Sequence, residues 1–267
     1  MHSLRLGMIP VAGFLAGIAL GAEPRTGYFE TAFDIIPSYA RADVLAQRTL
    51  SPNAVREIKA DTLAYSIDPR EENWQVYVPP HCASGSCGLL VWIYASDAPP
   101  MDRDWQAVFD KENVIFVAAL HSGNEHDPFE RRLPLALTGL GAIASNYPVD
   151  ASRVFVGGFS GGAKIAEVLA FGYPDVFHGV ILNAGFLDPA AGVLSYPPAP
   201  LDEHLQKLPF VFVVGRRDRL AWKDFLDTLD SFQARKFKVT QLTDPRQRHT
   251  PMTASQLRTA LEVLNGT

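Results

Sequence analysis

Short apolar runs alternate with amphipathic helical patterns over most of the chain. The middle runs are nearly continuous Val, Ile, Leu and Phe, which is typical of strands buried on both faces. Between them lie helical patterns such as Ile165, Val168 and Leu169, at spacings of three and four residues. This alternation predicts an α/β protein with a doubly wound, mostly parallel sheet and helices on both faces. The predicted strands are 74–78, 89–94, 114–120, 153–156, 179–182, 209–214 and 237–242.

The same pattern defines the expected domain organisation. Residues 61–267 are expected to form one domain, since no repeat or flexible linker interrupts the alternation. Residues 23–60 have no clear period and are expected to be an N-terminal extension of uncertain order. Residues 186–208 contain four prolines and form an irregular insertion, which either shapes a binding pocket or is a plain surface loop.

The first 22 residues have the features of an export signal. Arg5 supplies a positive charge, 6–22 is an uncharged run, and small residues end it at Ala22. An uncleaved anchor or a buried helix is the alternative, but the run is shorter than the roughly 20 residues of a membrane span. We therefore predict a cleaved signal peptide, a periplasmic or extracellular location, and no stable membrane association after cleavage.

The two cysteines of the chain, Cys82 and Cys87, are five positions apart. In an oxidising compartment they can close a small loop, so we expect a structural disulfide, with two free thiols as the alternative. A zinc site needs more ligands than this pair and the nearby His81 provide. The sequence therefore implies no metal.

The charge balance limits the class of partner. The chain has 24 Lys and Arg against 29 Asp and Glu, which gives a net charge of −5. A mildly acidic chain lacks the positive surface that holds phosphate backbones. We expect no nucleic-acid partner and no organic cofactor, and a small-molecule or oligomeric substrate instead.

The most informative motif is Gly158-Phe159-Ser160-Gly161-Gly162, a G-x-S-x-G pattern. A predicted strand leads into it and a predicted helix leaves it, so the serine lies on a sharp strand-to-helix turn that exposes its hydroxyl. A glycine-rich packing turn or a phosphate-binding turn is the alternative. The spacing does not fit G-x-G-x-x-G, so a Rossmann site is disfavoured. Ser160 is the predicted nucleophile.

A serine hydroxyl needs a base, and chain order selects it. On this kind of sheet the order is serine, acid, histidine, and His249 follows the last predicted strand. His178 precedes a strand and so lies at the opposite edge, whereas His204 lies in the irregular insertion. We predict that His249 is the base, the alternative being an exposed loop histidine.

Two carboxylates are candidates for the acid that orients this histidine. Asp218 lies just past the carboxyl end of the strand 209–214, and Asp188 follows the preceding strand. Asp218 is preferred and Asp188 is the second choice. A helix N-cap is the alternative role for Asp218.

Two N–H donors are needed for the oxyanion that forms on attack. Gly161, at the start of the helix, is expected to supply one. The second is expected from Ser96 or Asp97, in the loop after the second predicted strand. His121 and Asn124 follow the third strand at the same edge, where they are candidate substrate-binding residues or ordinary loop residues.

Two further motifs flank the serine motif: Tyr147-Pro148-Val149-Asp150 with Arg153 before it, and Tyr173-Pro174-Asp175-Val176-Phe177 after the helix. With these motifs the chain resembles α/β-hydrolase fold serine esterases, and within them the secreted esterases related to polyhydroxybutyrate depolymerases and feruloyl esterases. The resemblance spans roughly residues 73–262 and implies that Ser160, Asp218 and His249 are the nucleophile, acid and base. Members commonly have His-Gly in the loop where this chain reads Tyr94-Ala95-Ser96-Asp97. Depolymerases also tend to carry a further substrate-binding domain, so the resemblance implies a soluble or oligomeric ester rather than a crystalline polymer.

The predicted function is therefore that of a secreted serine hydrolase that cleaves carboxylic esters through an acyl-enzyme. A peptidase or amidase with the same three residues is the first alternative. The second is a binding protein that keeps the fold without the chemistry.

Overall fold

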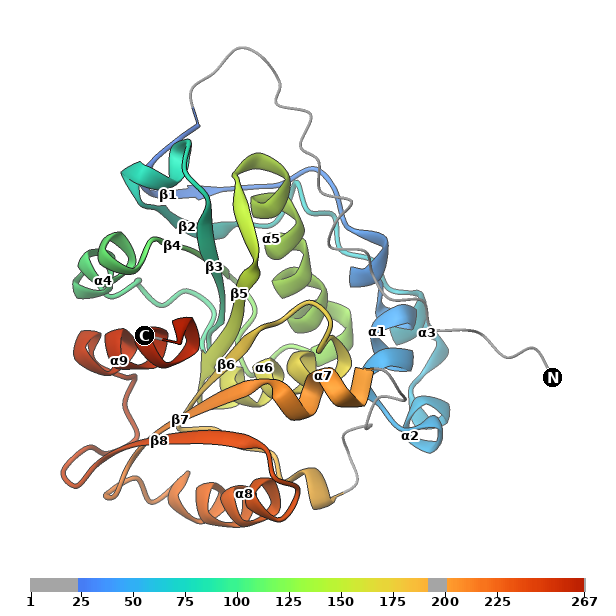
Figure 1. Cartoon of the computed structure of the whole chain (residues 1–267). Coiled ribbons are helices and arrows are strands. Elements are labelled where there is room, and N and C mark those ends of the chain that lie inside the picture. Colours follow the sequence, from blue (N-terminus) through green and yellow to red (C-terminus); the bar gives the residue numbers. More distant parts are fainter. Residues whose placement is uncertain (1–23, 192–200, 267) are drawn as a thin grey trace.

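Eight strands form one sheet in the order β1-β2-β4-β3-β5-β6-β7-β8. A computed structural model of the chain describes residues 24–191 and 201–266, so the predicted signal peptide at 1–22 and part of the 186–208 insertion lie outside the described residues. From β3 to β8 all neighbours are parallel, whereas β1 and β2 pair antiparallel with their neighbours (Figure 1). The strands are β1 (Gly27–Thr31), β2 (Trp74–Val78), β3 (Cys87–Ile93), β4 (Val114–Ala119), β5 (Val149–Phe159), β6 (Gly179–Asn183), β7 (Pro209–Gly215) and β8 (Lys238–Asp244).

Helices cover both faces of this sheet, which confirms the predicted doubly wound α/β architecture. Helices α5, α6 and α8 pack on one face, and α4 and α9 pack on the other (Figure 1). Helices α1 to α3 lie in the N-terminal segment, and α7 precedes β7. The helices are α1 (Ala42–Thr49), α2 (Pro52–Glu57), α3 (Ala60–Ala64), α4 (Asp104–Glu112), α5 (Leu133–Asn146), α6 (Gly161–Gly172), α7 (Leu201–Lys207), α8 (Trp222–Ala234) and α9 (Ala254–Asn265).

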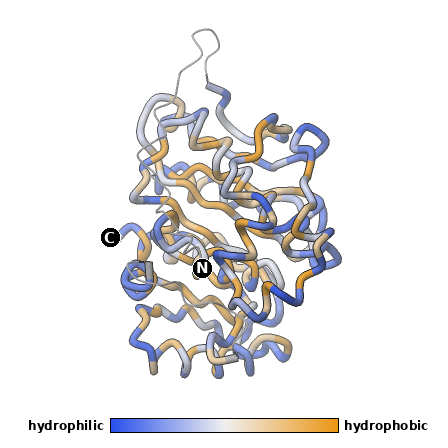
Figure 2. Tube along the Cα trace, turned by 90° about the vertical axis from the view of Figure 1, so that its right-hand side faces the viewer, coloured by the Kyte–Doolittle hydropathy of each residue, from blue (hydrophilic) through white to orange (hydrophobic). Residues whose placement is uncertain are grey.

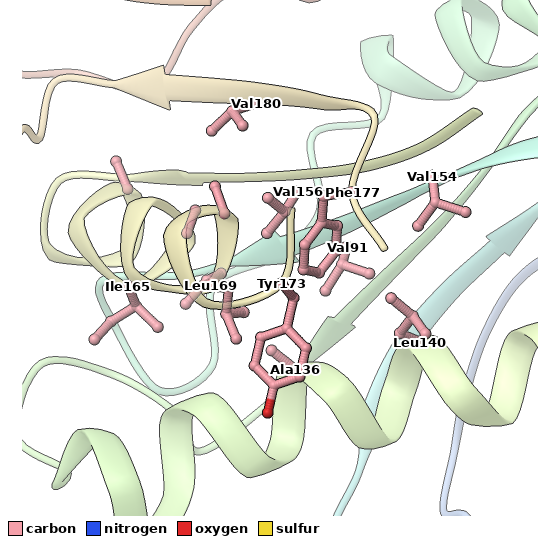
Figure 3. Packing of buried hydrophobic residues seen from close by; sticks show 14 of the residues in the cluster. Val91, Ala136, Leu140, Val154, Val156, Ile165, Leu169, Tyr173, Phe177 and Val180 are labelled. Atoms are coloured by element: carbon pink, nitrogen blue, oxygen red, sulfur yellow. The ribbon is translucent and has the colours of Figure 1, made fainter. Parts of the chain in front are cut away.

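Both faces of the central strands are buried, as their continuous apolar sequences predict. Leu89 and Val91 of β3 point into the larger core with α5 and α6, whereas Leu90 and Trp92 point into the smaller core with α4 and α9. Hydrophobic positions follow the strands through the middle of the molecule, and hydrophilic positions lie around them (Figure 2). In the larger core, Ile165 and its neighbours on α6 pack against α5 and the sheet (Figure 3).

Helix α5 was not predicted from the sequence. Ten of its fourteen residues are buried, so it lacks the polar face that makes an amphipathic pattern visible. The helix is preceded by a single π-helical turn at Pro128–Arg132, which Asp127 caps by accepting hydrogen bonds from the N–H groups of Phe129 and Glu130.

The segment 24–60, which has no sequence period, joins the body through two elements. Strand β1 adds to the sheet beside β2, and α1 buries Leu45 and Ala46. Arg48 of α1 bonds to the carbonyl of Gly172 and forms a buried ion pair with Asp175, with an N–O distance of 2.6 Å. These contacts fix α1 against the end of α6.

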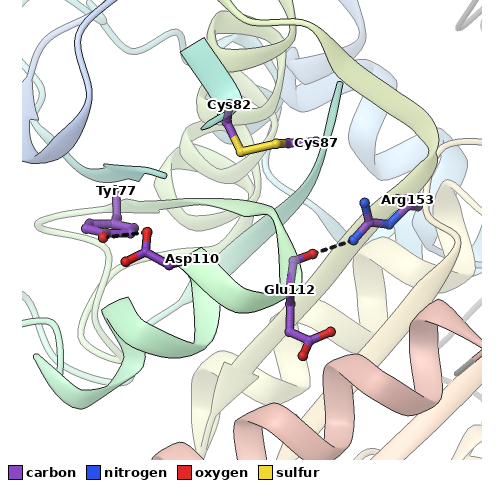
Figure 4. Close-up of a disulfide and its surroundings, with 6 residues drawn as sticks. All are labelled: Tyr77, Cys82, Cys87, Asp110, Glu112 and Arg153. Atoms are coloured by element: carbon purple, nitrogen blue, oxygen red, sulfur yellow. Dashed lines mark hydrogen bonds between the residues drawn. A yellow bond between two sulfur atoms is a disulfide. The ribbon is translucent and has the colours of Figure 1, made fainter. Parts of the chain in front are cut away.

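Cys82 and Cys87 are joined in a disulfide. It links the short 3₁₀ helix after β2 to the first residue of β3 (Figure 4). This is the amino end of β3, so the disulfide lies at the opposite edge of the sheet from the loops that follow the parallel strands.

Candidate active site

Ser160 occupies the turn between β5 and α6, at φ 55° and ψ −123°. A side chain at positive φ is strained and persists only where its surroundings hold it. The N–H of Ser160 donates to the carbonyl of Asn183 on β6, at 2.8 Å. A Cβ on Gly162 would lie 2.0 Å from the carbonyl oxygen of Ile93, and one on Gly185 would lie 1.8 Å from that of Ser160. The turn therefore requires glycine at both positions.

A continuous chain of hydrogen bonds joins the three residues that the sequence selects. The Oγ of Ser160 lies 2.9 Å from Nε2 of His249. The Nδ1 of the same ring lies 2.8 Å from Oδ2 of Asp218. If Nδ1 carries the proton, it donates to the carboxylate, and Nε2 is free to accept the serine proton. This arrangement has the geometry of a nucleophile, a base and an orienting acid.

Asp218 faces the histidine and also stabilises the turn before α8, but it is not the N-cap of that helix, which is Ala221. The Asp218 side chain is fully buried, and Oδ1 accepts the N–H groups of Leu220 and Ala221, each at 3.0 Å. Oδ2 is thereby left to face the histidine. Asp188, the second choice, instead accepts the N–H of Ala190 at 2.8 Å. A hydrogen bond from Ser231 is the largest cause that lowers the pKa of Asp188. Asp188 therefore bonds within its own loop and to Ser231, and it is not the partner of His249.

Asn183 holds the serine and histidine loops in register, a role that sequence reasoning missed. Its side chain is buried between β7 and the loop after β8: Oδ1 accepts the N–H of Met252 at 2.7 Å, and Nδ2 donates to the carbonyl of Val213. The ring of Phe159, the residue before the serine, lies 5.0 Å from the ring of His249. No motif marks Asn183, because its partners are distant backbone groups.

Several backbone N–H groups of the candidate site have no hydrogen-bond acceptor among the described residues, so they are candidates to bind an oxyanion. Gly161 is the first residue of α6, and its N–H has no acceptor among the described residues, as is usual for a first helical turn. The N–H groups of Ala95 and Ser96 also have no acceptor in the described part of the chain. Asp97 is engaged elsewhere, since its carbonyl accepts from His121 and its carboxylate from Gly123. These contacts of Asp97 do not involve its N–H group, so Ser96 and Asp97 both stay candidates for the second donor.

Arg132 stabilises the loop after β3. The guanidinium is buried, and it donates to the carbonyls of Ser122 at 2.8 Å and Tyr94 at 3.0 Å. It therefore joins the loop after β3 to the loop after β4. Burial lowers the pKa of Arg132 to about 10, so the group stays charged at neutral pH.

Asn124 and His121 lie in the loop after β4, at the same edge of the sheet. The N–H of Asn124 donates to the carbonyl of Ala95, and its exposed carboxamide lies directly against Gly161, where a Cβ would be 2.1 Å from Oδ1. Asn124 is thus brought to the oxyanion side of the serine. The side chain of His121 is exposed and makes no hydrogen bond within the described residues.

A buried carboxyl group, that of Glu167, stabilises the loop after β6. Glu167 on α6 is fully buried, and its Oε2 accepts the N–H of Leu187, in the loop after β6, at 2.8 Å. Its Oε1 has no partner in the described part of the chain. Burial raises the pKa of Glu167 well above its ordinary value. The group is therefore held in its neutral form over a range of pH in which an exposed glutamate is charged.

Within residues 24–191 and 201–266, no group of three His, Cys, Asp or Glu side chains is arranged to hold a metal ion. No helix within these ranges combines the length and the apolar character that a membrane span requires.

Comparisons with known proteins identify the fold. No protein-family model and no curated protein sequence matches the chain. Among solved structures it is similar to an S-formylglutathione hydrolase from Agrobacterium tumefaciens (TM-score 0.52, 16% identity, 73% of this chain and 88% of that one). It is also similar to Est1E from Butyrivibrio proteoclasticus (TM-score 0.53, 15% identity, 75% of this chain and 96% of that one). A third similar structure is dipeptidyl peptidase 4 from Porphyromonas gingivalis (TM-score 0.54, 14% identity, 80% of this chain and 37% of that one). Together with the eight-stranded sheet and the serine turn, these likenesses show that the chain has the α/β-hydrolase fold.

Proposed function

We propose that the protein is a serine hydrolase that cleaves carboxylic esters through an acyl-enzyme. The observation that carries the proposal is the unbroken hydrogen-bond chain from buried Asp218 through His249 to the strained Ser160. A packing turn needs the glycines but has no use for a buried carboxylate aligned with an imidazole and a hydroxyl.

Acylation follows from this geometry. As the Oγ of Ser160 attacks the ester carbonyl carbon, Nε2 of His249 takes the hydroxyl proton, and Asp218 stabilises the imidazolium. The carbonyl oxygen becomes an oxyanion that accepts from Gly161 and from the Ala95–Ser96 loop. The carbon–oxygen bond to the alcohol then breaks, and Nε2 returns the proton to the departing alcohol oxygen.

Deacylation repeats the sequence with water. His249 takes a proton from a water molecule as its oxygen attacks the acyl carbon. Collapse of the second tetrahedral intermediate breaks the bond to Ser160, whose Oγ recovers the proton from Nε2. The products are the free acid, the alcohol and the unchanged enzyme, so no cofactor is consumed.

The test compares wild type with Ser160→Ala and with a matched control, Ser86→Ala, in which the exposed serine lies at the far edge of the sheet beside β3. We expect hydrolysis of short 4-nitrophenyl esters and labelling by a fluorophosphonate in wild type and control. The nucleophile variant should lose at least about 10³-fold in kcat/KM. Retained activity in Ser160→Ala would show that Ser160 is not the nucleophile.

A matching series of 4-nitroanilides decides between ester and amide substrates. An amine leaves less readily than a phenol, so an esterase should show far lower kcat/KM on the anilides. Faster cleavage of the anilides would favour the peptidase alternative, which the likeness to a dipeptidyl peptidase keeps in view. Absence of both hydrolysis and labelling would favour a protein that binds without catalysing.

A further inference from the structure

Five arginines crowd the two loops that carry the acid and the base. Each is exposed, and each is within three positions of Asp218 or His249 in the sequence. We call this set the arginine rim. Its members are Arg216, Arg217 and Arg219 in the loop after β7, and Arg246 and Arg248 in the loop after β8.

The two loops that carry the rim lie side by side. The N–H of Arg216 donates to the carbonyl of Asp244 at 2.8 Å, and the N–H of Arg217 donates to the carbonyl of Gln247 at 3.1 Å. The loops also touch at Gly215, where a Cβ would lie 2.0 Å from the carbonyl oxygen of Gln247. These contacts hold the backbone of the loop that carries Asp218 against the backbone of the loop that carries His249.

None of the five guanidinium groups forms an ion pair with a described residue. Some arginines elsewhere do: Arg48 pairs with Asp175, and Arg131 pairs with Glu72. The two loops contain two carboxylates, Asp218, which faces the histidine, and Asp244.

Asp244 offsets only part of the rim's charge: backbone hydrogen bonds are the largest cause that lowers its pKa, and the charge of Arg246 adds to them. Its Oδ1 accepts the N–H groups of Arg246 and Gln247, at 2.7 and 3.1 Å. On the adjacent helix α8, Asp224 pairs with Lys164 and Asp227 with Lys223. Five arginines beside Asp218 and Asp244 therefore leave an excess of positive charge on a chain whose net charge is −5, and such a field draws in small anions.

The chemistry of ester cleavage decides which part of the substrate faces the rim. His249 must give its proton to the departing alcohol oxygen, so that oxygen has to lie within hydrogen-bond distance of Nε2. The carbonyl oxygen points instead toward Gly161, on the other side of the serine. The alcohol part of the ester therefore extends over the histidine loop and its arginines.

We propose that the arginine rim binds an anionic group, a carboxylate, sulfate or phosphate, on the alcohol part of the ester substrate. This inference rests on the proposed esterase activity and names its substrate class. Arginine suits the task because its planar fork matches such oxyanions and keeps its charge. The rim offsets the repulsion that the acidic body of the protein exerts on an anionic substrate.

The experiment uses pairs of esters that differ in one charge. On the alcohol side, 4-carboxyphenyl acetate is compared with the neutral 4-carbamoylphenyl acetate. On the acyl side, 4-nitrophenyl hydrogen adipate is compared with 4-nitrophenyl methyl adipate. We expect kcat/KM to favour the anion about tenfold or more in the alcohol pair at low salt, and not in the acyl pair. The preference should shrink in about 1 M NaCl, where charges are screened within about 3 Å.

Matched double variants assign the preference to the rim. Arg246→Gln with Arg248→Gln, and Arg216→Gln with Arg217→Gln, each remove two charges. Arg56→Gln with Arg258→Gln removes the same charge from exposed sites on α2 and α9. We expect the anion-to-neutral ratio to fall toward one in the rim variants and to stay near wild type in the control. The ratio is the readout, so a general loss of activity cancels.

A ratio near one in wild type, an equal fall in the control, or a preference confined to the acyl pair would overturn the proposal. Binding to Ser160→Ala gives a readout that needs no turnover. Calorimetry should show tighter binding of 4-carboxyphenyl acetate than of its carbamoyl analogue, and equal affinities would count against the rim. Failure of the esterase itself is recognised separately, because the neutral esters would not be cleaved and the fluorophosphonate would not label Ser160.

Discussion

At the scale of single residues, buried polar groups hold the loops that carry the chemistry. Asn183 connects the serine turn to the segment after His249, and Arg132 joins the loops after β3 and β4. Glu167 does the same for the loop after β6, but as an uncharged group. Because its pKa is raised by burial, the folded protein keeps a proton that the unfolded chain releases.

This difference makes stability depend on pH. Below the ordinary pKa of 4.5, both states bind the proton. Above it the unfolded state loses the proton first, so stability falls by about 1.4 kcal/mol per pH unit until the raised pKa is reached. Glu167→Gln has no such proton, so its stability relative to wild type should rise as the pH increases above 4.5, until the raised pKa of Glu167 is reached. Urea unfolding at each pH measures this, with the exposed Glu57→Gln as control. A constant difference would show that Glu167 is charged in the fold.

At the scale of elements, the start of α6 offers two adjacent glycines with opposite expectations. A Cβ on Gly162 would meet the backbone oxygen of Ile93, which β3 holds in place. A Cβ on Gly161 would meet only the end of the exposed Asn124 side chain, which is able to rotate away.

Gly162→Ala should therefore destabilise the protein by about 3 kcal/mol or more. Gly161→Ala should change stability by no more than about 1 kcal/mol. Urea unfolding of the two variants beside wild type measures both. Similar losses in the two would mean that the contact with Ile93 does not set the requirement for glycine at position 162, since helix propensity by itself favours alanine.

The elements also show where sequence reasoning succeeds. All seven predicted strands are present because each is an apolar run with few alternatives, and the serine turn is recognisable because its glycines and its flanking strand are adjacent in the sequence. Strand β1 has a single buried residue, Phe29, among partly or fully exposed ones, so its partner decides its conformation. The contact between Asn124 and Gly161 joins separate loops, and no local pattern encodes it.

At the scale of the whole molecule, the N-terminal segment is anchored by one buried ion pair. Arg48 and Asp175 have side chains that are 5% and 1% exposed, and the guanidinium also lies 4.2 Å from the ring centre of Tyr173. Asp175 belongs to the motif after α6 on which the family resemblance was based.

Arg48→Ala leaves a buried carboxylate without its cation, and we expect a loss of about 3 kcal/mol or more in unfolding free energy. Arg41→Ala breaks an exposed pair with Asp43 and should cost less than about 1 kcal/mol. Chemical denaturation of the two variants checks the contrast. Equal small losses would show that α1 contributes little to the stability of the body.

The strand order has a consequence for how activity appears in time. The parallel neighbours β3 and β5 are separated by β4 and two helices, and His249 follows β8, the last strand to be added along the chain. Sheets built from such distant pairings fold slowly. Ser160 and Asp218 thus have no base until the far edge of the sheet is in place. During refolding, the recovery of the proposed ester hydrolysis should lag behind the recovery of secondary structure. The rate at which activity returns would then report the final step of assembly.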